Sequence, residues 1–325
     1  MDIIKQIRRP IAEDMEKYKL LFDSYLQHSD PLLHEVFLNI SSRKGKMMRP
    51  MLTLLVIRLL GGVIDDKAMH TAATFEYFHT ASLVHDDIVD ESEQRRGVKS
   101  IHCSYGNKVA VLVGDYLLAN GLLCASKVDS PRLVGIVSKA AQALASGEIL
   151  QLSNVSNQSI DEKVYYDIIN RKTAALFSAC SEAGALRAST DENVIQNMSL
   201  FGHYVGMCFQ IRDDIFDYDT SADIGKPTGN DMKEGKLTLP LIYALNHSND
   251  EYMQKLAHKV KSGEISDDEI DELVSFTRSN GGIEYAEHVM KTFADKAKDV
   301  LSSYPDGEIK SSLMMYVDYV IKRDL

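Results

Sequence analysis

Two acidic segments that share one pattern are the features of this sequence best suited to chemistry. The first is Asp86-Asp87-Ile88-Val89-Asp90, and the second is Asp213-Asp214-Ile215-Phe216-Asp217. Each closely follows an apolar run with helical spacing, so we expect the first and last aspartate of each cluster to lie one turn apart on one helix face. Like charges at that spacing destabilise a helix by roughly 0.2–0.5 kcal/mol, which usually indicates a solvated surface or a bound cation.

Carboxylates on two different helices are suited to holding metal ions around a polyphosphate. Mg²⁺ is a hard ion that keeps several waters and takes only about one or two protein carboxylates, with substrate phosphates as further ligands. If the two clusters face each other across a cavity, they could hold several Mg²⁺ ions there. A single acidic run, such as Asp267-Asp268-Glu269, is more typical of a solvated helix face.

Basic residues are grouped beside both acidic clusters. Lys46 and Arg49 precede the first cluster, Arg95 and Arg96 follow it, and Lys226 and Lys236 follow the second. Metal ions on the carboxylates would take one diphosphate, and the basic side chains would take another directly. Arginine suits that contact because its planar fork binds phosphate with two hydrogen bonds. The pattern therefore predicts a two-part anion site.

Helices must position these residues, because helical periodicity dominates the chain. Apolar residues recur at helical spacing over 51–60, 67–85, 108–126, 133–152, 161–186 and 191–218, and in several stretches from 237 onwards. Asp66 and Asp191 are placed to cap the helices that carry the first and the second cluster. Several of these runs are apolar around most of their circumference, which is typical of the centre of a bundle. We predict an all-α fold.

Composition limits the other classes of function. The chain has 325 residues, only 7 prolines and no low-complexity linker, so we predict a single domain over 1–325. Its net charge of −11 argues against a nucleic-acid partner and a polybasic membrane anchor. The four cysteines are widely spaced and lack metal-ligand patterns, so free thiols in a cytoplasmic protein are expected. The N-terminus has no signal-peptide pattern, and no apolar run is expected to reach membrane-spanning length.

The sequence resembles the all-trans polyprenyl diphosphate synthases, especially their medium- and long-chain members, over nearly its whole length. The resemblance rests on Gly45-Lys46-Met47-Met48-Arg49-Pro50, Glu76 with 79–90, Arg95-Arg96-Gly97, Gly106-Asn107, 114–118, Gly147-Glu148 with Gln151, Lys172-Thr173, and Gly206 with 210–217. It implies one large helical bundle around a central cavity, and Mg²⁺-dependent head-to-tail addition of isopentenyl diphosphate to an allylic diphosphate. The departures, at Met47, Met48 and 98–100, affect loop geometry.

The resemblance also implies roles for individual residues. The Mg²⁺ ions that clamp the allylic diphosphate would be bound by Asp86, Asp90 and Asp213, supported by Asp87, Asp214 and Asp217. The same diphosphate would be contacted by Arg95, Lys172, Lys226 and Lys236. The diphosphate of isopentenyl diphosphate would be held by Lys46, Arg49, His79 and Arg96. The allylic cation would be steadied by Thr173, Gln210 and the carbonyl of Lys172.

Product length is predicted from the helix that ends at the first cluster. Ala81 and Ser82 lie five and four residues before Asp86, and both are small where short-chain members of the family commonly carry an aromatic residue. One helical turn rises about 5.4 Å, roughly one isoprene unit. We therefore expect a product longer than geranylgeranyl diphosphate, in the range from hexaprenyl to octaprenyl. Phe78 is a possible floor of the tunnel, and sequence leaves its direction open.

Three alternatives remain. A geranylgeranyl or farnesyl diphosphate synthase would differ only in tunnel depth. A class I terpene cyclase would not need Lys46, Arg49 and Arg96 for a second diphosphate, and a non-catalytic subunit of a heteromeric synthase would tend to lose aspartates or lysines that this chain keeps. We also expect a homodimer, because the run 112–123 is apolar on more than one face and the resemblance points the same way.

Overall fold

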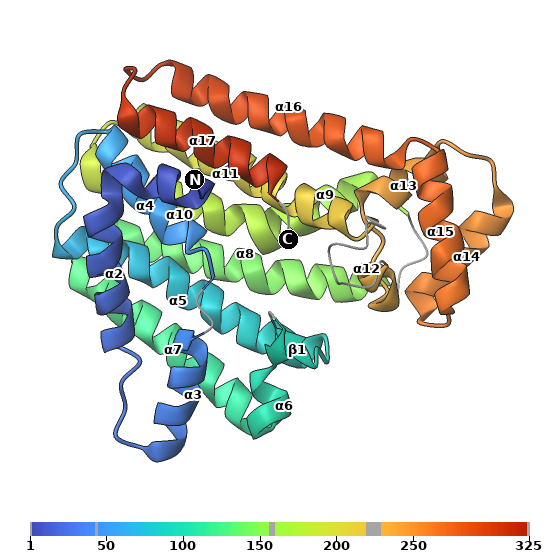
Figure 1. The fold of residues 1–325 in the computed structure, drawn as a ribbon, viewed down its shortest axis with the longest axis horizontal. Coiled ribbons are helices and arrows are strands. Elements are labelled where there is room, and N and C mark those ends of the chain that lie inside the picture. Colours follow the sequence, from blue (N-terminus) through green and yellow to red (C-terminus); the bar gives the residue numbers. More distant parts are fainter. Residues whose placement is uncertain (1, 43–44, 96, 156–159, 219–228, 324–325) are drawn as a thin grey trace. The chain divides into compact units, whose positions relative to one another are not determined.

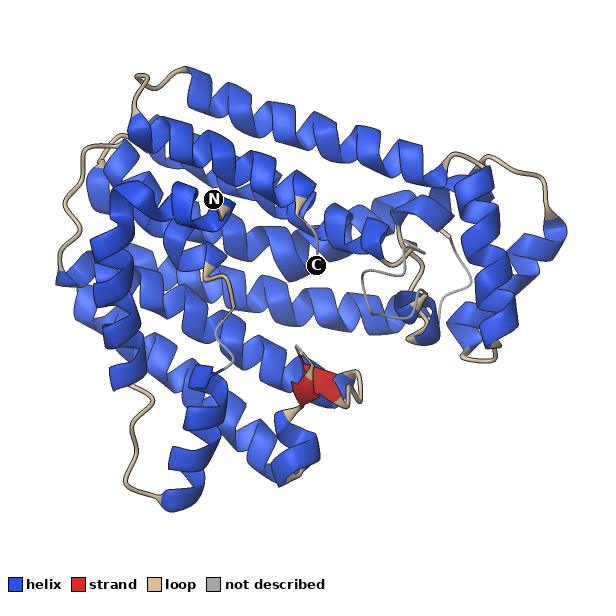
Figure 2. Ribbon diagram, viewed as in Figure 1, coloured by secondary structure: helices blue, strands red, loops and turns tan. Residues whose placement is uncertain are grey.

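The structure, a computed structural model, describes residues 2–42, 45–95, 97–155, 160–218 and 229–323 (Figure 1). Helices form most of it, and the strands of the described part are one short pair (Figure 2). The all-α prediction is confirmed, although the β-hairpin was not foreseen. Contacts divide the chain into two compact units. Unit 1 comprises Met1–Ala141, Ala179–Ser199 and Ser303–Met315, and unit 2 comprises Gln142–Ser178, Leu200–Ser302 and Tyr316–Leu325. The expectation of a single domain stays a prediction.

The elements that lie wholly in unit 1 belong to the first part of the chain. They are α1 (Ile3–Arg8), a 3-10 turn (Arg9–Ile11), α2 (Ala12–Ser24), α3 (Pro31–Ser42), α4 (Met48–Leu59), α5 (Asp66–Val89), β1 (Gln94–Arg95), β2 (Val98–Lys99), α6 (Ile101–Tyr105) and α7 (Asn107–Val128). Sequence analysis predicted no helix before residue 51, so α1, α2 and α3 were missed. The buried residues Met15, Tyr18 and Phe22 of α2 recur at spacings of three and four, which is the helical signal that was available.

Helix α5 is the element that positions the first acidic cluster. Asp65 is its N-cap, and its carboxylate accepts a hydrogen bond from the backbone N–H of Ala68 at 2.8 Å. The prediction of Asp66 as the cap was therefore wrong by one residue. At the other end, the N–H of Asp90 donates to the carbonyl of Asp86 at 2.8 Å, which confirms that these two aspartates are one turn apart. Within unit 1, α5 packs along α7 (Figure 1).

In the described part of the chain, four helices contribute residues to both units: α8 (Pro131–Val155), α10 (Ala175–Ala188), α11 (Glu192–Phe216) and α17 (Glu308–Lys322). The carboxylate of Asp191 accepts from the N–H of Asn193 at 2.9 Å, so its predicted capping of α11 is confirmed. The second acidic cluster begins on the last turn of α11.

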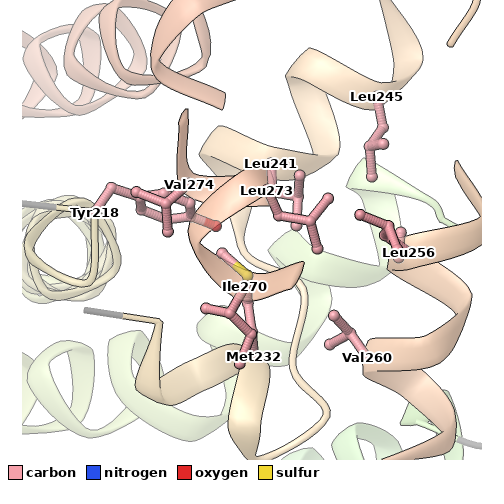
Figure 3. Close-up of a cluster of buried hydrophobic side chains, with 10 residues drawn as sticks. Tyr218, Met232, Leu241, Leu245, Leu256, Val260, Ile270, Leu273 and Val274 are labelled. Atoms are coloured by element: carbon pink, nitrogen blue, oxygen red, sulfur yellow. The ribbon is translucent and has the colours of Figure 1, made fainter. Parts of the chain in front are cut away.

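The elements wholly in unit 2 are α9 (Glu162–Ile169), a π-turn (Asn170–Ala174), α12 (Asn230–Lys233), α13 (Leu239–Asn246), α14 (Glu251–Ser262), α15 (Asp267–Ser279) and α16 (Gly282–Ser302). The single helix expected over 161–186 is thus interrupted by a turn that is wider than α. An apolar cluster that includes Leu241, Leu256 and Leu273 joins α13, α14 and α15 (Figure 3).

This apolar cluster also anchors the segment that carries the second acidic cluster. Tyr218, which directly follows Asp217, belongs to it, as does Met232 of α12 (Figure 3). The hydroxyl of Tyr218 lies 2.9 Å from the hydroxyl of Thr238. Burial of the ring and this hydrogen bond fix the chain immediately after Asp217.

Helices α7 and α8 are long and apolar enough, by length and composition alone, to cross a membrane, and they are the ones that meet this test in the described residues. The expectation that no apolar run reaches that length was therefore wrong. One or two such helices are weak indications, because core helices of water-soluble proteins meet the same test. In unit 1, α7 packs against α5 and α6.

Candidate active site

The first acidic cluster lies at the C-terminal end of α5, where Asp87 is only 3% exposed. The guanidinium of Arg95 donates to the carboxylate of Asp87, with Nε 2.7 Å from Oδ1. Asp86 and Asp90 are half-buried. Arg95, which is predicted to contact a diphosphate, therefore pairs with Asp87, the second aspartate of the cluster. Its guanidinium can bind Asp87 and an incoming anion at the same time.

A pocket in unit 1 borders this cluster. Its polar lining includes Glu76, His79, Asp87 and Arg95, and its apolar lining includes Leu83. Gly45 and Met47, the two neighbours of Lys46, also line it, whereas Lys46 and Arg49 are not among the described lining residues. The side chain of Arg8 donates to the carbonyl of Lys46. Arg96 lies outside the described residues. The structure thus brings His79, Arg95 and the Lys46 loop to one pocket.

The second cluster is organised around Asp214, which is 3% exposed. Its carboxylate accepts hydrogen bonds from the hydroxyl of Tyr165 at 2.5 Å and from the side-chain amide of Gln210 at 2.9 Å. The hydroxyl of Thr173 donates in turn to the amide oxygen of Gln210 at 2.6 Å. Two residues predicted to steady a cation are therefore bonded to each other and to a predicted metal-site aspartate.

Burial raises the pKa of the Asp214 carboxyl, and the charges of Asp213 and Asp217 raise it further, whereas the hydrogen bonds from Tyr165 and Gln210 oppose this. Burial also raises the pKa of Asp231, together with the charges of Asp214 and Asp217. A carboxylate in such surroundings gains most from a nearby cation, because the cation restores the stabilisation that water would give.

Asp213 and Asp217 already have defined partners. Arg323 forms an ion pair with Asp213, and its guanidinium lies 3.7 Å from the centroid of the Phe209 ring. The carboxylate of Asp217 accepts from the N–H of Asn230 at 2.8 Å and from the N–H of Asp231 at 3.1 Å. Asp217 therefore caps the start of α12, whereas Asp213 pairs with the guanidinium of Arg323.

A pocket in unit 2 borders this second cluster. Its lining includes Gln151, Lys172, Gln210, Asp214, Asp231 and Lys236. The ammonium of Lys172 lies 2.5 Å from a carboxylate oxygen of Glu148, and that of Lys236 lies 2.5 Å from a carboxylate oxygen of Glu234. Lys226 lies outside the described residues. Two of the lysines predicted to contact the allylic diphosphate are thus found beside the second aspartate cluster.

Two glycines allow the π-turn to approach its neighbours closely. A Cβ added to Gly147 of α8 would lie 2.7 Å from the Cβ of Arg171, and one added to Gly206 of α11 would lie 2.5 Å from the Cα of Ala174. Both distances are far below normal carbon contact. Only glycine at these positions lets the turn that carries Lys172 and Thr173 contact both helices.

Residues 30–277 match the family model for polyprenyl synthetase. The chain belongs to the polyprenyl synthetase family. It is 34% identical, over 96% of its own length and 94% of the relative's, to the octaprenyl diphosphate synthase of Haemophilus influenzae. Among solved structures, it is similar to a geranylgeranyl pyrophosphate synthase from Bacteroides thetaiotaomicron, with 47% identity and a TM-score of 0.88 over 99% of this chain and 100% of that one. A decaprenyl diphosphate synthase from Rhodobacter capsulatus gives 35% identity and a TM-score of 0.91, over 98% of both chains.

These comparisons confirm the resemblance, the all-α prenyl synthase fold and the predicted enzyme class, a prenyltransferase that makes polyprenyl diphosphates. The individual site residues of this polyprenyl synthetase family member stay predictions, because a family match does not test them one by one.

The three residues predicted to set product length lie on the middle of α5. Ala81 is fully buried, and Ser82 is half-buried with its hydroxyl donating to the carbonyl of His79 at 2.9 Å. Phe78 is buried against α7, where its ring carbons would lie 2.7–2.8 Å from a Cβ added to Gly121. The direction of Phe78, left open by the sequence, is therefore toward α7.

The donor set fits Mg²⁺ only with help from substrate. Within the described residues, no group of three or more His, Cys, Asp or Glu side chains converges on one metal position. Mg²⁺ does not require such a group, since one or two carboxylates plus phosphate oxygens and waters satisfy it. The Asp213 carboxylate already pairs with the Arg323 guanidinium, so a Mg²⁺ ion bound there would have to share or replace that ion pair.

Sequence reasoning missed Tyr165, Asp231 and Arg323. Tyr165 and Arg323 contact the second cluster from 49 and 110 residues away. No spacing pattern connects residues so distant. Asp231 lies in the polar segment that follows the second cluster, close to Lys236, whose N–H donates to the carbonyl of Asp231 at 2.8 Å. That proximity was the available signal.

Proposed function

We propose that this protein adds isopentenyl diphosphate, head to tail, to an allylic diphosphate in a Mg²⁺-dependent reaction, and makes an all-trans polyprenyl diphosphate from hexaprenyl to octaprenyl in length. One observation carries the proposal: each aspartate cluster ends a long helix beside a pocket that also has cationic side chains. In unit 1, the aspartate and the cationic side chain that line the pocket are Asp87 and Arg95. In unit 2 they are Asp214 with Lys172 and Lys236.

The first step is loss of diphosphate from the allylic substrate. Asp86, Asp90 and Asp213 would hold the Mg²⁺ ions, whose positive charge would stabilise the departing diphosphate. Arg95, Lys172, Lys226 and Lys236 contact the same diphosphate and stabilise the charge that develops on it. No side-chain nucleophile is required, because the allylic C–O bond breaks by ionisation.

Thr173 and Gln210 then face an electron-poor carbon. Thr173 uses its only hydroxyl hydrogen to donate to the amide oxygen of Gln210, so the lone pairs of its own oxygen remain available. Gln210 is held in one orientation, since its nitrogen donates to Asp214. A fixed dipole with its negative end at the cation stabilises it without reorganisation.

The second substrate is held through its own diphosphate by Lys46, Arg49, His79 and Arg96. Its double bond attacks the allylic cation, and the released diphosphate accepts the proton that is lost. Arg49 is buried on α4, and Arg58 of the same helix forms an ion pair with Asp14 at 3.0 Å. Arg49→Ala should therefore raise the Michaelis constant for isopentenyl diphosphate, with Arg58→Ala as the matched control. If the two variants had the same Michaelis constant for isopentenyl diphosphate, Arg49 would not bind this substrate.

The direct test is incubation of purified protein with Mg²⁺, isopentenyl diphosphate and each allylic primer, followed by sizing of the products by mass spectrometry. Hexaprenyl to octaprenyl diphosphate supports the proposal. A cyclised hydrocarbon would indicate a terpene cyclase, and activity only after addition of another subunit would indicate a heteromeric synthase.

A shorter product is the second candidate, because the solved structure that is 47% identical to this chain is named a geranylgeranyl pyrophosphate synthase. The small, half-buried side chain of Ser82 favours the longer product. In the same assay, accumulation of geranylgeranyl diphosphate with excess isopentenyl diphosphate would establish the shorter one.

We further propose a cytoplasmic homodimer whose product is directed to membranes. On α7, Leu112 is 67% exposed and Leu122 is 53% exposed, which leaves apolar surface that a second copy would bury. The four cysteines are free thiols, as expected in a reducing compartment. Light scattering at micromolar concentration should give the mass of a dimer, and a fully active monomer would contradict this.

A further inference from the structure

The ammonium of Lys172 is held by two side chains of α8. Its Nζ lies 2.5 Å from Glu148 Oε2 and donates to Gln151 Oε1 at 3.1 Å. The ion pair is sheltered, with 22% of the Lys172 side chain and 16% of the Glu148 side chain exposed. Lys172 and Gln151 line the unit 2 pocket, whereas Glu148 is not among its described lining residues. Glu148 therefore contacts the lysine from outside the pocket.

The backbone keeps this contact short. Gly147 precedes Glu148, and a Cβ there would lie 3.0 Å from Lys172 Cγ and 3.1 Å from its backbone nitrogen. Helix α8 thus contacts the π-turn directly at this point. Gln151 follows Glu148 by three residues, so both side chains leave the same face of α8. Their own side chains are linked, with Gln151 Nε2 donating to Glu148 Oε1 at 3.4 Å.

A lysine needs such an anchor to act as a fixed charge. Its ammonium sits on a flexible four-carbon chain and binds phosphate as a point charge without directional preference. An unanchored Lys172 would have to lose rotamer freedom each time a diphosphate binds. A carboxylate and an amide oxygen on one rigid helix face remove that freedom beforehand.

We propose that Glu148 is a positioning residue, which holds the Lys172 ammonium at the unit 2 pocket in the orientation that receives the diphosphate. The proposal rests on the proposed function, which assigns Lys172 to the allylic diphosphate. Glu148 acts through the lysine and does not touch substrate. The same carboxylate could instead compete with the diphosphate for Lys172, and the two roles predict opposite effects of removing it.

The test compares Glu148→Ala and Glu148→Gln with wild type. Loss of the anchor should raise the Michaelis constant for the allylic diphosphate roughly tenfold in Glu148→Ala, equivalent to about 1.4 kcal/mol, and leave that for isopentenyl diphosphate unchanged. Glu148→Gln keeps an oxygen acceptor, so its Michaelis constant for the allylic diphosphate should lie between those of wild type and Glu148→Ala. Lower constants than wild type in both variants would show competition and overturn the proposal.

A double variant tests whether the effect passes through the lysine. Glu148→Ala should add nothing to Lys172→Ala, because residues that act as one unit are not additive. Full additivity would overturn the proposal. Asp167→Ala is the matched control, since Asp167 forms an exposed ion pair at 2.6 Å with Arg171, the residue before Lys172. It should leave both Michaelis constants at wild-type values.

Binding of inorganic diphosphate with Mg²⁺, measured by calorimetry, gives a readout that does not need turnover. Glu148→Ala should weaken this binding about tenfold relative to wild type and to Asp167→Ala. A wild type that binds diphosphate but does not join the two substrates would refute the proposed function alone. Unchanged diphosphate affinity in Glu148→Ala would refute the positioning role alone.

Discussion

The ring of Phe78 fills the space left by the missing side chain of Gly121. A Cβ at position 121 would lie 2.7 Å from Cδ2 and 2.8 Å from Cε2 of that ring. Carbon atoms in contact normally lie about 3.5–4.0 Å apart. In Gly121→Ala, the Phe78 ring must therefore move by about 1 Å within a buried contact between α5 and α7.

The size of the effect follows from two opposing terms. Overpacking of a core typically costs about 1–3 kcal/mol. Replacement of glycine by alanine inside a helix contributes about 0.5–1 kcal/mol in the other direction. We therefore expect Gly121→Ala to lower the free energy of unfolding by about 1 kcal/mol, within the range of roughly 0–2.5 kcal/mol that the two terms allow. Phe78→Ala alone should lower it by about 3–5 kcal/mol. With alanine at 78, the clash with the ring is gone and a contact of 3.3 Å with the backbone oxygen of Thr74 remains. Gly121→Ala should therefore cost less in the Phe78→Ala background than in the wild type.

Urea denaturation of wild type, both single variants and the double variant measures how much of the cost of Gly121→Ala depends on the Phe78 ring. Gly135→Ala is the matched control, because a Cβ added to this helical glycine of α8 would have no atom within 4 Å apart from its own chain neighbours and helix backbone. It should be neutral or stabilising. If Gly121→Ala destabilises the protein equally with and without the Phe78 ring, the ring does not occupy that space. Sizing of the prenyl products made by the same variants in the absence of urea would show whether Phe78→Ala also lengthens the product.

Three further outcomes are expected. Asp86→Ala or Asp213→Ala should lower turnover by roughly a hundredfold or more with unchanged helicity by circular dichroism, since one lost electrostatic stabiliser costs about 3–4 kcal/mol; near-normal turnover would exclude a metal-binding role. Ser82→Phe should shorten the product, measured by mass spectrometry, whereas Ala81→Phe should mainly destabilise the core because Ala81 is fully buried; an unchanged product from Ser82→Phe would mean that the tail does not follow this face. Burial and the charge of Lys296 lower the pKa of His203, so stability should fall as pH drops below about 6.5, where the unfolded chain takes up the proton first. Melting temperatures at about pH 7.5 and 5.5 should differ less in His203→Gln than in wild type, and equal differences would refute this.

Local features of the site could be predicted from sequence. The one-turn spacing of Asp86 and Asp90 is confirmed by the backbone hydrogen bond between them, and the cap at Asp191 is confirmed. Thr173 and Gln210 were named together by family resemblance, and they are joined by a hydrogen bond. These features depend on helical periodicity or on motif matches, which a single sequence contains.

Contacts between distant parts of the chain could not be predicted. The hydrogen bond from Tyr165 to Asp214 and the ion pair between Arg323 and Asp213 depend on which helices pack together. The π-turn was also missed, because one extra residue barely disturbs apolar periodicity over a run as long as 161–186. The error at Asp65 and Asp66 is of another kind, since either aspartate could cap and only the backbone conformation decides.

The π-turn at Asn170–Ala174 makes the length of this segment as important as its composition. A π-turn contains about one residue more than an α-turn, and one residue in a helix corresponds to a rotation of about 100°. Deletion of Asn170 would allow an uninterrupted α-helix. It would also rotate Thr173 about the helix axis relative to Tyr165, so that Thr173 would no longer point toward Gln210. The protein would then keep every predicted site residue and lose the alignment between them. An insertion or deletion between Tyr165 and Thr173 should therefore be tolerated less well than most substitutions there.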